Sequence, residues 1–154
     1  MDDGFSGVCG CHGGRMTTPP LADVPIRSAA DLTARWERLL APPVFGARSL
    51  WLCWLDDGLM VPLVVPVDEI PARPGRTMLA NLPSLCQTVV EEHVFGGAHV
   101  AMALCRPGLP TVTRDDEAWA AGLREAFADE DCTWSLHLAA GGSVVPMVEE
   151  HWSR

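Results

Sequence analysis

Two apolar runs on either side of a short acidic turn constrain the fold of this chain most strongly. Residues 49–55 read SLWLCWL, residues 59–67 read LMVPLVVPV, and the turn between them, 56–58, reads DDG. Apolar segments of this length around an Asp-Gly turn are typical of a β-hairpin. Pro62 and Pro66 cannot donate to a strand ladder, so we expect the second strand to be bulged or to lie at a sheet edge.

The rest of the chain alternates between helical and strand patterns. Helices are predicted at residues 29–40, 76–93 and 114–128, and further strands at 99–105, 133–138 and 143–148. In the predicted helices apolar residues recur at helical spacing, and the predicted strands are short apolar runs bounded by turn residues. Ser28 and Thr113 are the expected N-caps, and Pro83 either kinks the second helix or begins a second segment. The order α-β-β-α-β-α-β-β predicts an α/β (α+β) fold with a mixed sheet flanked by helices.

The composition indicates one globular domain without an obvious charged ligand. The 154 residues are 48% hydrophobic and 20% charged, which suffices for one core. The net charge is −9, and all eleven basic residues are scattered arginines. Nucleic-acid binders need a basic face, and anionic membranes repel an acidic one, so we expect neither partner. No apolar run reaches the roughly 18 residues of a membrane helix, and no secretory leader is recognised, so a cytoplasmic location is predicted.

The N-terminal part of the chain differs in character from the rest. Residues 1–27 are rich in Gly, Pro and Thr and show no periodicity, so we expect a flexible arm before a domain spanning 28–150. Met16 is an alternative start, in which case residues 1–15 are not translated.

The six cysteines do not indicate a disulfide framework. They stand at positions 9, 11, 53, 86, 105 and 132. Residues 9–12 (CGCH) offer three of the four ligands that zinc needs, without the usual spacing, so an unstructured or untranslated tail is the competing interpretation. Cys53, Cys86 and Cys105 lie inside apolar segments and are expected to be buried thiols.

Several segments occur in an order that matches a known family. They are SAADL at 28–32, LWLCWLD at 50–56, VAMALCRPG at 100–108, TRDD at 113–116, LR at 123–124, LHL at 136–138 and GG at 141–142. From about Ser28 to Met147, this set resembles the RadC-like branch of the JAB/MPN metallopeptidase-like domains. The resemblance implies a three-layer, JAB/MPN-like (cytidine deaminase-like) architecture.

The metal motif of that family is degenerate in this chain. Active members carry H-x-H-P and then S-x-x-D: two His and the Asp hold zinc, a water fills the fourth position, and an upstream Glu is the general base. With Pro107 matched to the motif proline, the histidine positions hold Leu104, which cannot ligate, and Arg106, which repels a cation. Arg48 and Ser49 stand where the general base would lie. The resemblance therefore implies no metal, no cofactor and no catalytic residue.

Two interpretations of the remaining motif residues stay open. In the first, Arg106 and Asp116 form an ion pair in a vestigial pocket, shared with Thr113 and His137, that binds a small anion or a peptide end. In the second, Thr113 caps a helix and Asp116 favours its positive N-terminal end. The spacing from Pro107 to Thr113 is one residue shorter than the family pattern.

Other residues suggest alternative chemistry. Arg106 beside Cys105 could create a reactive thiolate, paired with His137 or His99 as a base. Strand alternation places Cys105 on the opposite face from Arg106, which favours an inert buried thiol. His137 between two leucines is typical of a core or edge histidine.

Trp51 and Trp54, three residues apart in one predicted strand, must face opposite sides of the sheet. One is expected in the core, and the other is expected under a helix or in an interface.

Together these observations predict a non-catalytic JAB/MPN-like domain that acts as a binding or scaffold module, with a protein partner or a second copy of itself. One alternative is a residual zinc hydrolase whose rearranged site uses Asp116, His137 and a cysteine. Another is a small-ligand sensor built on the pocket around Arg106. Bound zinc would distinguish the hydrolase, and ligand-dependent thermal shifts would support the sensor.

Overall fold

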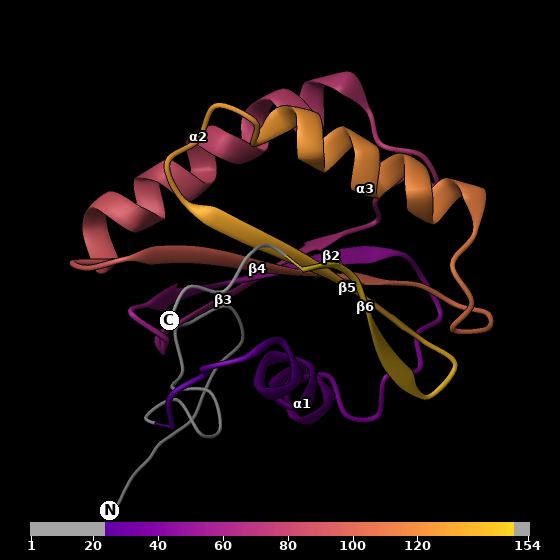
Figure 1. Ribbon diagram of the computed structural model, residues 1–154. Coiled ribbons are helices and arrows are strands. Elements are labelled where there is room, and N and C mark those ends of the chain that lie inside the picture. The colour runs from indigo at the N-terminus through magenta and orange to yellow at the C-terminus, as the bar shows by residue number, and fades with distance from the viewer. Residues whose placement is uncertain (1–23, 150–154) are drawn as a thin grey trace, which may run out of the picture.

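The computed structural model describes residues 24–149, and its eight elements follow the predicted order (Figure 1). They are α1 (Ala29–Leu39), β2 (Ser49–Asp56), β3 (Leu59–Asp68), α2 (Arg76–His93), β4 (Ala98–Cys105), α3 (Arg114–Ala126), β5 (Thr133–Ala140) and β6 (Ser143–Glu149). The strands form one sheet in the order β3-β2-β4-β5-β6. Only the β4–β5 pair is parallel, so the sheet is mixed and the α+β class is confirmed.

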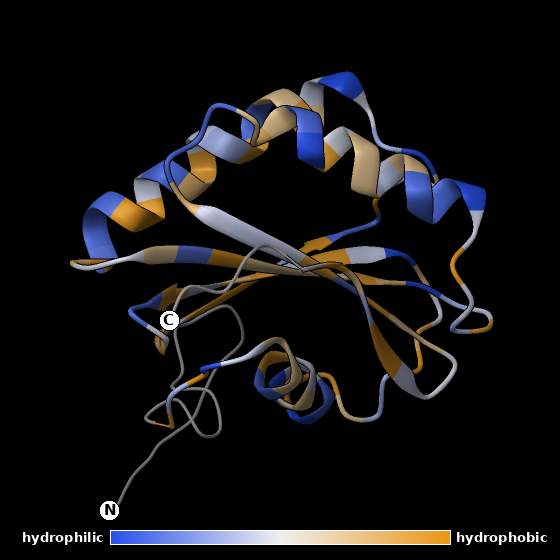
Figure 2. Ribbon diagram, viewed as in Figure 1, coloured by the Kyte–Doolittle hydropathy of each residue, from blue (hydrophilic) through white to orange (hydrophobic). Residues whose placement is uncertain are grey.

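Helices cover both faces of the sheet. Helices α2 and α3 lie on one face and α1 lies on the other (Figure 1). Alternation along β4 divides its side chains between the two sides: Val100, Met102 and Leu104 pack toward α2 and α3, while Ala101, Ala103 and Cys105 pack toward α1. The small residues on the second side leave room for Trp36 of α1, which is fully buried. The apolar colouring of the strands in Figure 2 reflects this two-sided burial.

The predicted helix starts are confirmed. The Ser28 hydroxyl accepts a hydrogen bond from the Asp31 amide at 3.1 Å, and the Asp31 carboxylate accepts one from the Arg27 amide at 2.9 Å. Thr113 begins α3 with a full capping box. Pro83 neither ends nor divides α2, which runs through it as one helix.

The packed chain begins before Ser28. Ile26, inside the predicted arm, is buried, and its amide donates to the carbonyl of Gly58 at 2.8 Å. At least part of the segment predicted as an arm therefore belongs to the domain. The predictions for residues 1–23, including the 9–12 cluster and Met16, fall outside the described residues.

Both edges of the sheet are interrupted. In β3, the pairing with β2 skips residues 61–63, and Pro62 lies in this bulge while Pro66 follows it. In β6, the pairing with β5 skips Met147 next to Pro146. A proline lacks an amide donor and a bulge breaks the ladder, so neither edge offers a regular row of hydrogen-bonding groups to another strand.

The two tryptophans of β2 are divided as predicted. Trp54 is fully buried on the α2 and α3 side, whereas Trp51 is half-buried on the α1 side. Cys53, Cys86 and Cys105 are buried free thiols. Within residues 24–149, no helix is both long enough and apolar enough to cross a membrane.

Candidate functional site

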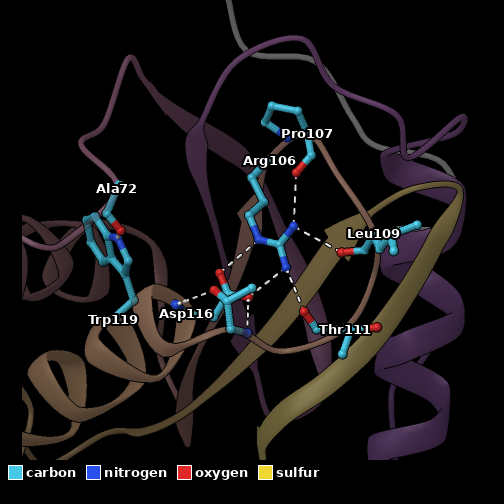
Figure 3. A network of polar contacts seen from close by, with 8 residues as sticks. Ala72, Arg106, Pro107, Leu109, Thr111, Asp116 and Trp119 are labelled. Atoms are coloured by element: carbon cyan, nitrogen blue, oxygen red, sulfur yellow. Dashed lines mark hydrogen bonds and ion pairs between the residues drawn. The ribbon is translucent and has the colours of Figure 1, made fainter.

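Arg106 and Asp116, the two charged residues singled out by the resemblance, lie where β4 ends and α3 begins. Arg106 follows β4 directly, and its amide donates to the carbonyl of Ala139 at 3.2 Å, which extends the β4–β5 pairing by one residue. The Arg106 side chain reaches Asp116 in the first turn of α3 (Figure 3). The loop of residues 107–113 connects the two and folds around the guanidinium.

Arg106 and Asp116 form a two-pronged ion pair. The Arg106 Nε donates to Asp116 Oδ1 at 2.9 Å, and Nη2 donates to Asp116 Oδ2 at 2.7 Å. Both side chains are almost completely removed from solvent, at 3% exposed for Arg106 and 0% for Asp116. This paired geometry is the strongest way for a guanidinium to hold a carboxylate.

The remaining donors of Arg106 bind main-chain carbonyls of the loop. Nη1 donates to the carbonyls of Pro107 at 2.9 Å and Leu109 at 3.0 Å, and Nη2 also donates to the carbonyl of Thr111 at 2.9 Å. A guanidinium has five N–H donors, so every one of them has a partner in the chain itself. An anion could reach Arg106 only by displacing one of these bonds.

Asp116 is at once the ion-pair partner and a helix cap. Its Oδ2 accepts from the Thr113 amide at 2.9 Å, and its own amide donates to Thr113 Oγ1 at 3.2 Å. The ion pair and the cap, which the sequence leaves as two interpretations, therefore coexist. Burial alone would raise the pKa of Asp116, but the bonds from Arg106 and Thr113 outweigh it and hold that pKa below its usual range. The hydrogen bond to Asp116 raises the pKa of Arg106.

Leu104 and His137 do not share this site. Leu104 is fully buried in the core beneath α2 and α3. His137 lies opposite Ala103 in the β4–β5 pairing, and its Nε2 is 2.8 Å from Thr33 Oγ1 of α1, so it faces the other side of the sheet. The sheet thus separates His137 from Asp116, and the predicted rearranged metal site of Asp116, His137 and a cysteine is not assembled. No group of three His, Cys, Asp or Glu side chains in the described part of the chain is placed to hold a metal ion.

His137 is a buried neutral imidazole. The Thr33 hydroxyl lies 3.1 Å from the carbonyl of Ala29, a bond it can donate, which leaves His137 Nε2 as the donor to Thr33. In that arrangement Nδ1 is unprotonated, and it has no hydrogen-bond partner although it is buried. Burial lowers the pKa of His137 to about 4.

His99 is the second buried histidine on the α1 side. Its Nδ1 is 2.7 Å from Thr133 Oγ1, and its Nε2 is 2.9 Å from Ser135 Oγ. Burial, and then the neighbouring His137, lower the pKa of His99 to about 4. Ser135 is 1% exposed, so this Ser–His contact offers no entry for a substrate.

The cysteine chemistry considered from the sequence is not supported by the geometry. Burial raises the pKa of Cys105 to about 12, and the hydrogen bond with Ser49 only partly opposes this. Cys105 packs on the α1 side, away from the Arg106 guanidinium. A reactive thiolate is therefore disfavoured at this position.

Two features of the site were missed from the sequence. One is the set of main-chain carbonyls that closes around Arg106. The other is Trp119, one turn beyond Asp116, whose indole nitrogen lies 3.0 Å from the carbonyl oxygen of Ala72 (Figure 3). The same nitrogen lies 3.3 Å from the carbonyl oxygen of Pro71. Helix α3 thus fixes two loops through neighbouring side chains. The prolines in both loops indicate from the sequence that these segments are loops. Nothing in the sequence identifies which of their carbonyls accept hydrogen bonds.

Comparisons with protein-family models, with curated proteins and with solved structures find nothing that matches this chain. The resemblance to RadC-like domains therefore stays a prediction.

Replacing Asp116 with Asn should destabilise the fold strongly. The variant keeps the shape of the side chain but leaves the Arg106 charge buried without its counter-ion, which typically costs about 3–5 kcal/mol. Asp115→Asn is the matched control, because Asp115 lies in the same helical turn and pairs with Arg73 at 3.5 Å in an exposed position. The control should lose less than about 1 kcal/mol. Urea unfolding measures both values. Equal losses would contradict a stabilising role for the buried pair of Arg106 and Asp116.

Stability should decline as the pH falls from about 6.5 to about 4. His99 and His137 have pKa values of about 4 in the fold, against 6.5 when unperturbed. Between these two pH values the unfolded chain binds protons that the folded chain excludes. The contribution of the two histidines to the free energy of unfolding is therefore fully present above pH 6.5 and is lost as the pH falls toward 4. Shifts of this size correspond to about 3 kcal/mol per histidine. The bonds from Arg106 and Thr113 hold the pKa of Asp116 below its usual range, so this decline is assigned to the histidines.

Urea unfolding at several pH values measures this decline. His137→Gln should lower the free energy of unfolding at pH 7 but flatten its fall toward pH 4.5. The same slope in wild type and variant would remove His137 as a cause.

Proposed function

We propose that this protein is a non-catalytic binding domain of JAB/MPN-like type, in which an internal ion pair occupies the position of a metal centre and fixes a contact surface for another protein. The observation that carries the proposal is the engagement of all five Arg106 donors by the protein's own chain. Leu104 and Arg106 leave no ligand at the two histidine positions of the motif. A site closed in this way can order a loop but has no open coordination position for chemistry.

The contact surface consists of three neighbouring loops, which we call the loop surface: residues 41–47, 107–112 and 141–142. The Gly142 amide donates to the carbonyl of Pro43 at 3.1 Å, which joins the first loop to the third. A Cβ at Gly141 would lie 2.8 Å from the carbonyl oxygen of Gly108, so the second and third loops are in main-chain contact. Gly141 also has a φ of +57°, which a side chain would strain.

The loop surface is uncharged and partly apolar on an otherwise acidic chain. None of its residues is Asp, Glu, Lys or Arg. Leu109 is 75% exposed, Val44 is 64% exposed and Val112 is 40% exposed. Depletion of charge and rigid exposed apolar side chains are features of the central part of protein–protein interfaces. Arg106 holds the second loop through hydrogen bonds to three of its carbonyls. Little conformational entropy is therefore lost when a partner binds to this loop.

Zinc analysis tests the non-catalytic part of the proposal. The full chain carrying Cys9→Ser and Cys11→Ser, purified without a metal-binding tag and incubated with zinc, should contain far less than one zinc per chain. The two substitutions remove the thiols of the N-terminal cluster, so residual zinc reports on the rest of the chain. Stoichiometric zinc in this variant would refute the non-catalytic reading.

A comparative capture experiment tests the loop surface. Proteins captured by the tagged full chain from cells that produce it should be lost with Leu109→Asp. Leu85→Asp on the exposed side of α2 is the control and should retain them, because Leu85 is 37% exposed and lies outside the loop surface. Binding that survives Leu109→Asp unchanged would show that partners do not use this surface.

A further inference from the structure

An isolated phenylalanine projects from the end of the sheet opposite the loop surface. Phe95 lies in the connection between α2 and β4, whereas residues 107–112 follow the other end of β4 (Figure 1). At 88% exposed, Phe95 is the most exposed large apolar side chain among residues 24–149. An aromatic ring this exposed adds little to the stability of the fold, since it forgoes the burial that phenylalanine usually gains.

The backbone beneath Phe95 is held in place by two carboxylates of the β-hairpin turn. The amides of Phe95 and Gly96 donate to the Asp56 carboxylate at 3.1 and 2.8 Å. The Gly97 amide donates to Asp57 Oδ1 at 2.7 Å, and the Asp57 amide donates back to the carbonyl of Gly97 at 2.8 Å. Three consecutive amides are thus fixed, and the ring stands on an ordered support.

A second apolar residue lies beside this support. Leu59 pairs with Asp56 across the end of the hairpin and is 43% exposed. The Asp56 carboxylate in turn holds the segment that carries Phe95. Phe95 and Leu59 are thus both tied to Asp56, one through its carboxylate and the other through strand pairing, and we call these two exposed apolar residues the Phe95 spot.

The surroundings of the Phe95 spot are acidic. Asp56 and Asp57 lie beneath it, and Glu91 and Glu92 occupy the exposed last turn of α2. Of the nearby basic residues, His93 has its Nε2 3.8 Å from a carboxylate oxygen of Glu92. The other basic residue near the hairpin turn is Arg27. It follows Ile26, whose amide donates a hydrogen bond to the carbonyl of Gly58 in that turn. A second copy of this chain, with its net charge of −9, would bring like charge to the spot.

We propose that the Phe95 spot is a docking site for a basic amphipathic segment of another protein, one that places apolar side chains against the Phe95 ring and lysines or arginines against the surrounding carboxylates. Rigid aromatic anchors often dominate binding energy, and complementary charge at the rim accelerates and orients association. The interrupted edges of β3 and β6 leave side-chain contacts of this kind, rather than strand addition, as the means of binding. The site is independent of the loop surface, so either can exist without the other.

Nuclear magnetic resonance titration of the ¹⁵N-labelled full chain tests the proposal. The probe is a synthetic amphipathic helical peptide composed of leucine and lysine, and its control is the same peptide with glutamate in place of lysine. The lysine peptide should shift the amide signals of residues 56–59 and 91–97. Phe95→Ser should weaken its binding at least about tenfold, as for an interface hot spot. Glu91→Gln with Glu92→Gln should weaken it less, and added salt should weaken it further.

Leu109→Ser is the matched control, since Leu109 is also a highly exposed apolar residue but belongs to the loop surface. It should bind the lysine peptide as wild type does. Unchanged thermal unfolding of Phe95→Ser verifies that the fold is intact. The proposal is overturned if the lysine peptide does not bind, if the glutamate peptide binds equally well, or if Phe95→Ser binds as tightly as wild type.

Discussion

A buried guanidinium–carboxylate pair ties three parts of the chain together: the end of β4, the loop of residues 107–113 and the first turn of α3. Removing two charges from water costs several kcal/mol for each ion, so such a pair persists only when the remaining donors and acceptors are also satisfied. Arg106 meets this condition with three loop carbonyls, and Asp116 meets it with the amide of Thr113. The loop conformation and the charge pair therefore depend on each other, and the position of Leu109 depends on both.

The opposite face of the sheet is held by different chemistry. There the polar groups are neutral: His99 and His137 are hydrogen-bonded to hydroxyls, and α1 approaches the sheet over the small side chains of β4. One face thus relies on an ionised pair, and the other relies on imidazoles that must stay unprotonated. The fold combines a charge-stabilised side and a charge-intolerant side around the same five strands.

Much of the fold was predictable because local chemistry determines it. The capping residues Ser28 and Thr113 and the DDG turn each act within a few residues, and all three lie where the sequence indicated. The separation of His137 from Asp116 was not predictable. Alternation tells which residues of one strand share a face, but it does not tell which face of a neighbouring strand lies on the same side of the sheet. That requires the β4–β5 register, which places His137 opposite Ala103.

The main-chain carbonyls that bind Arg106 could not be predicted from the sequence either. Every residue has a carbonyl, so the choice among them depends on how the loop closes in three dimensions. The pinned amides beneath Phe95 are hidden for the same reason. The carboxylates that bind the amides of Gly96 and Gly97 come from 40 residues earlier in the chain.

The prolines and bulges of β3 and β6 have a consequence for how this protein could evolve new contacts. A sheet with regular open edges gains partners through its main chain, which is the same for every sequence and discriminates poorly. Here that generic route is obstructed on both sides, so recognition falls to a few individual side chains. A single codon change at such a side chain could then create or abolish a partnership while the strands beneath it remain undisturbed.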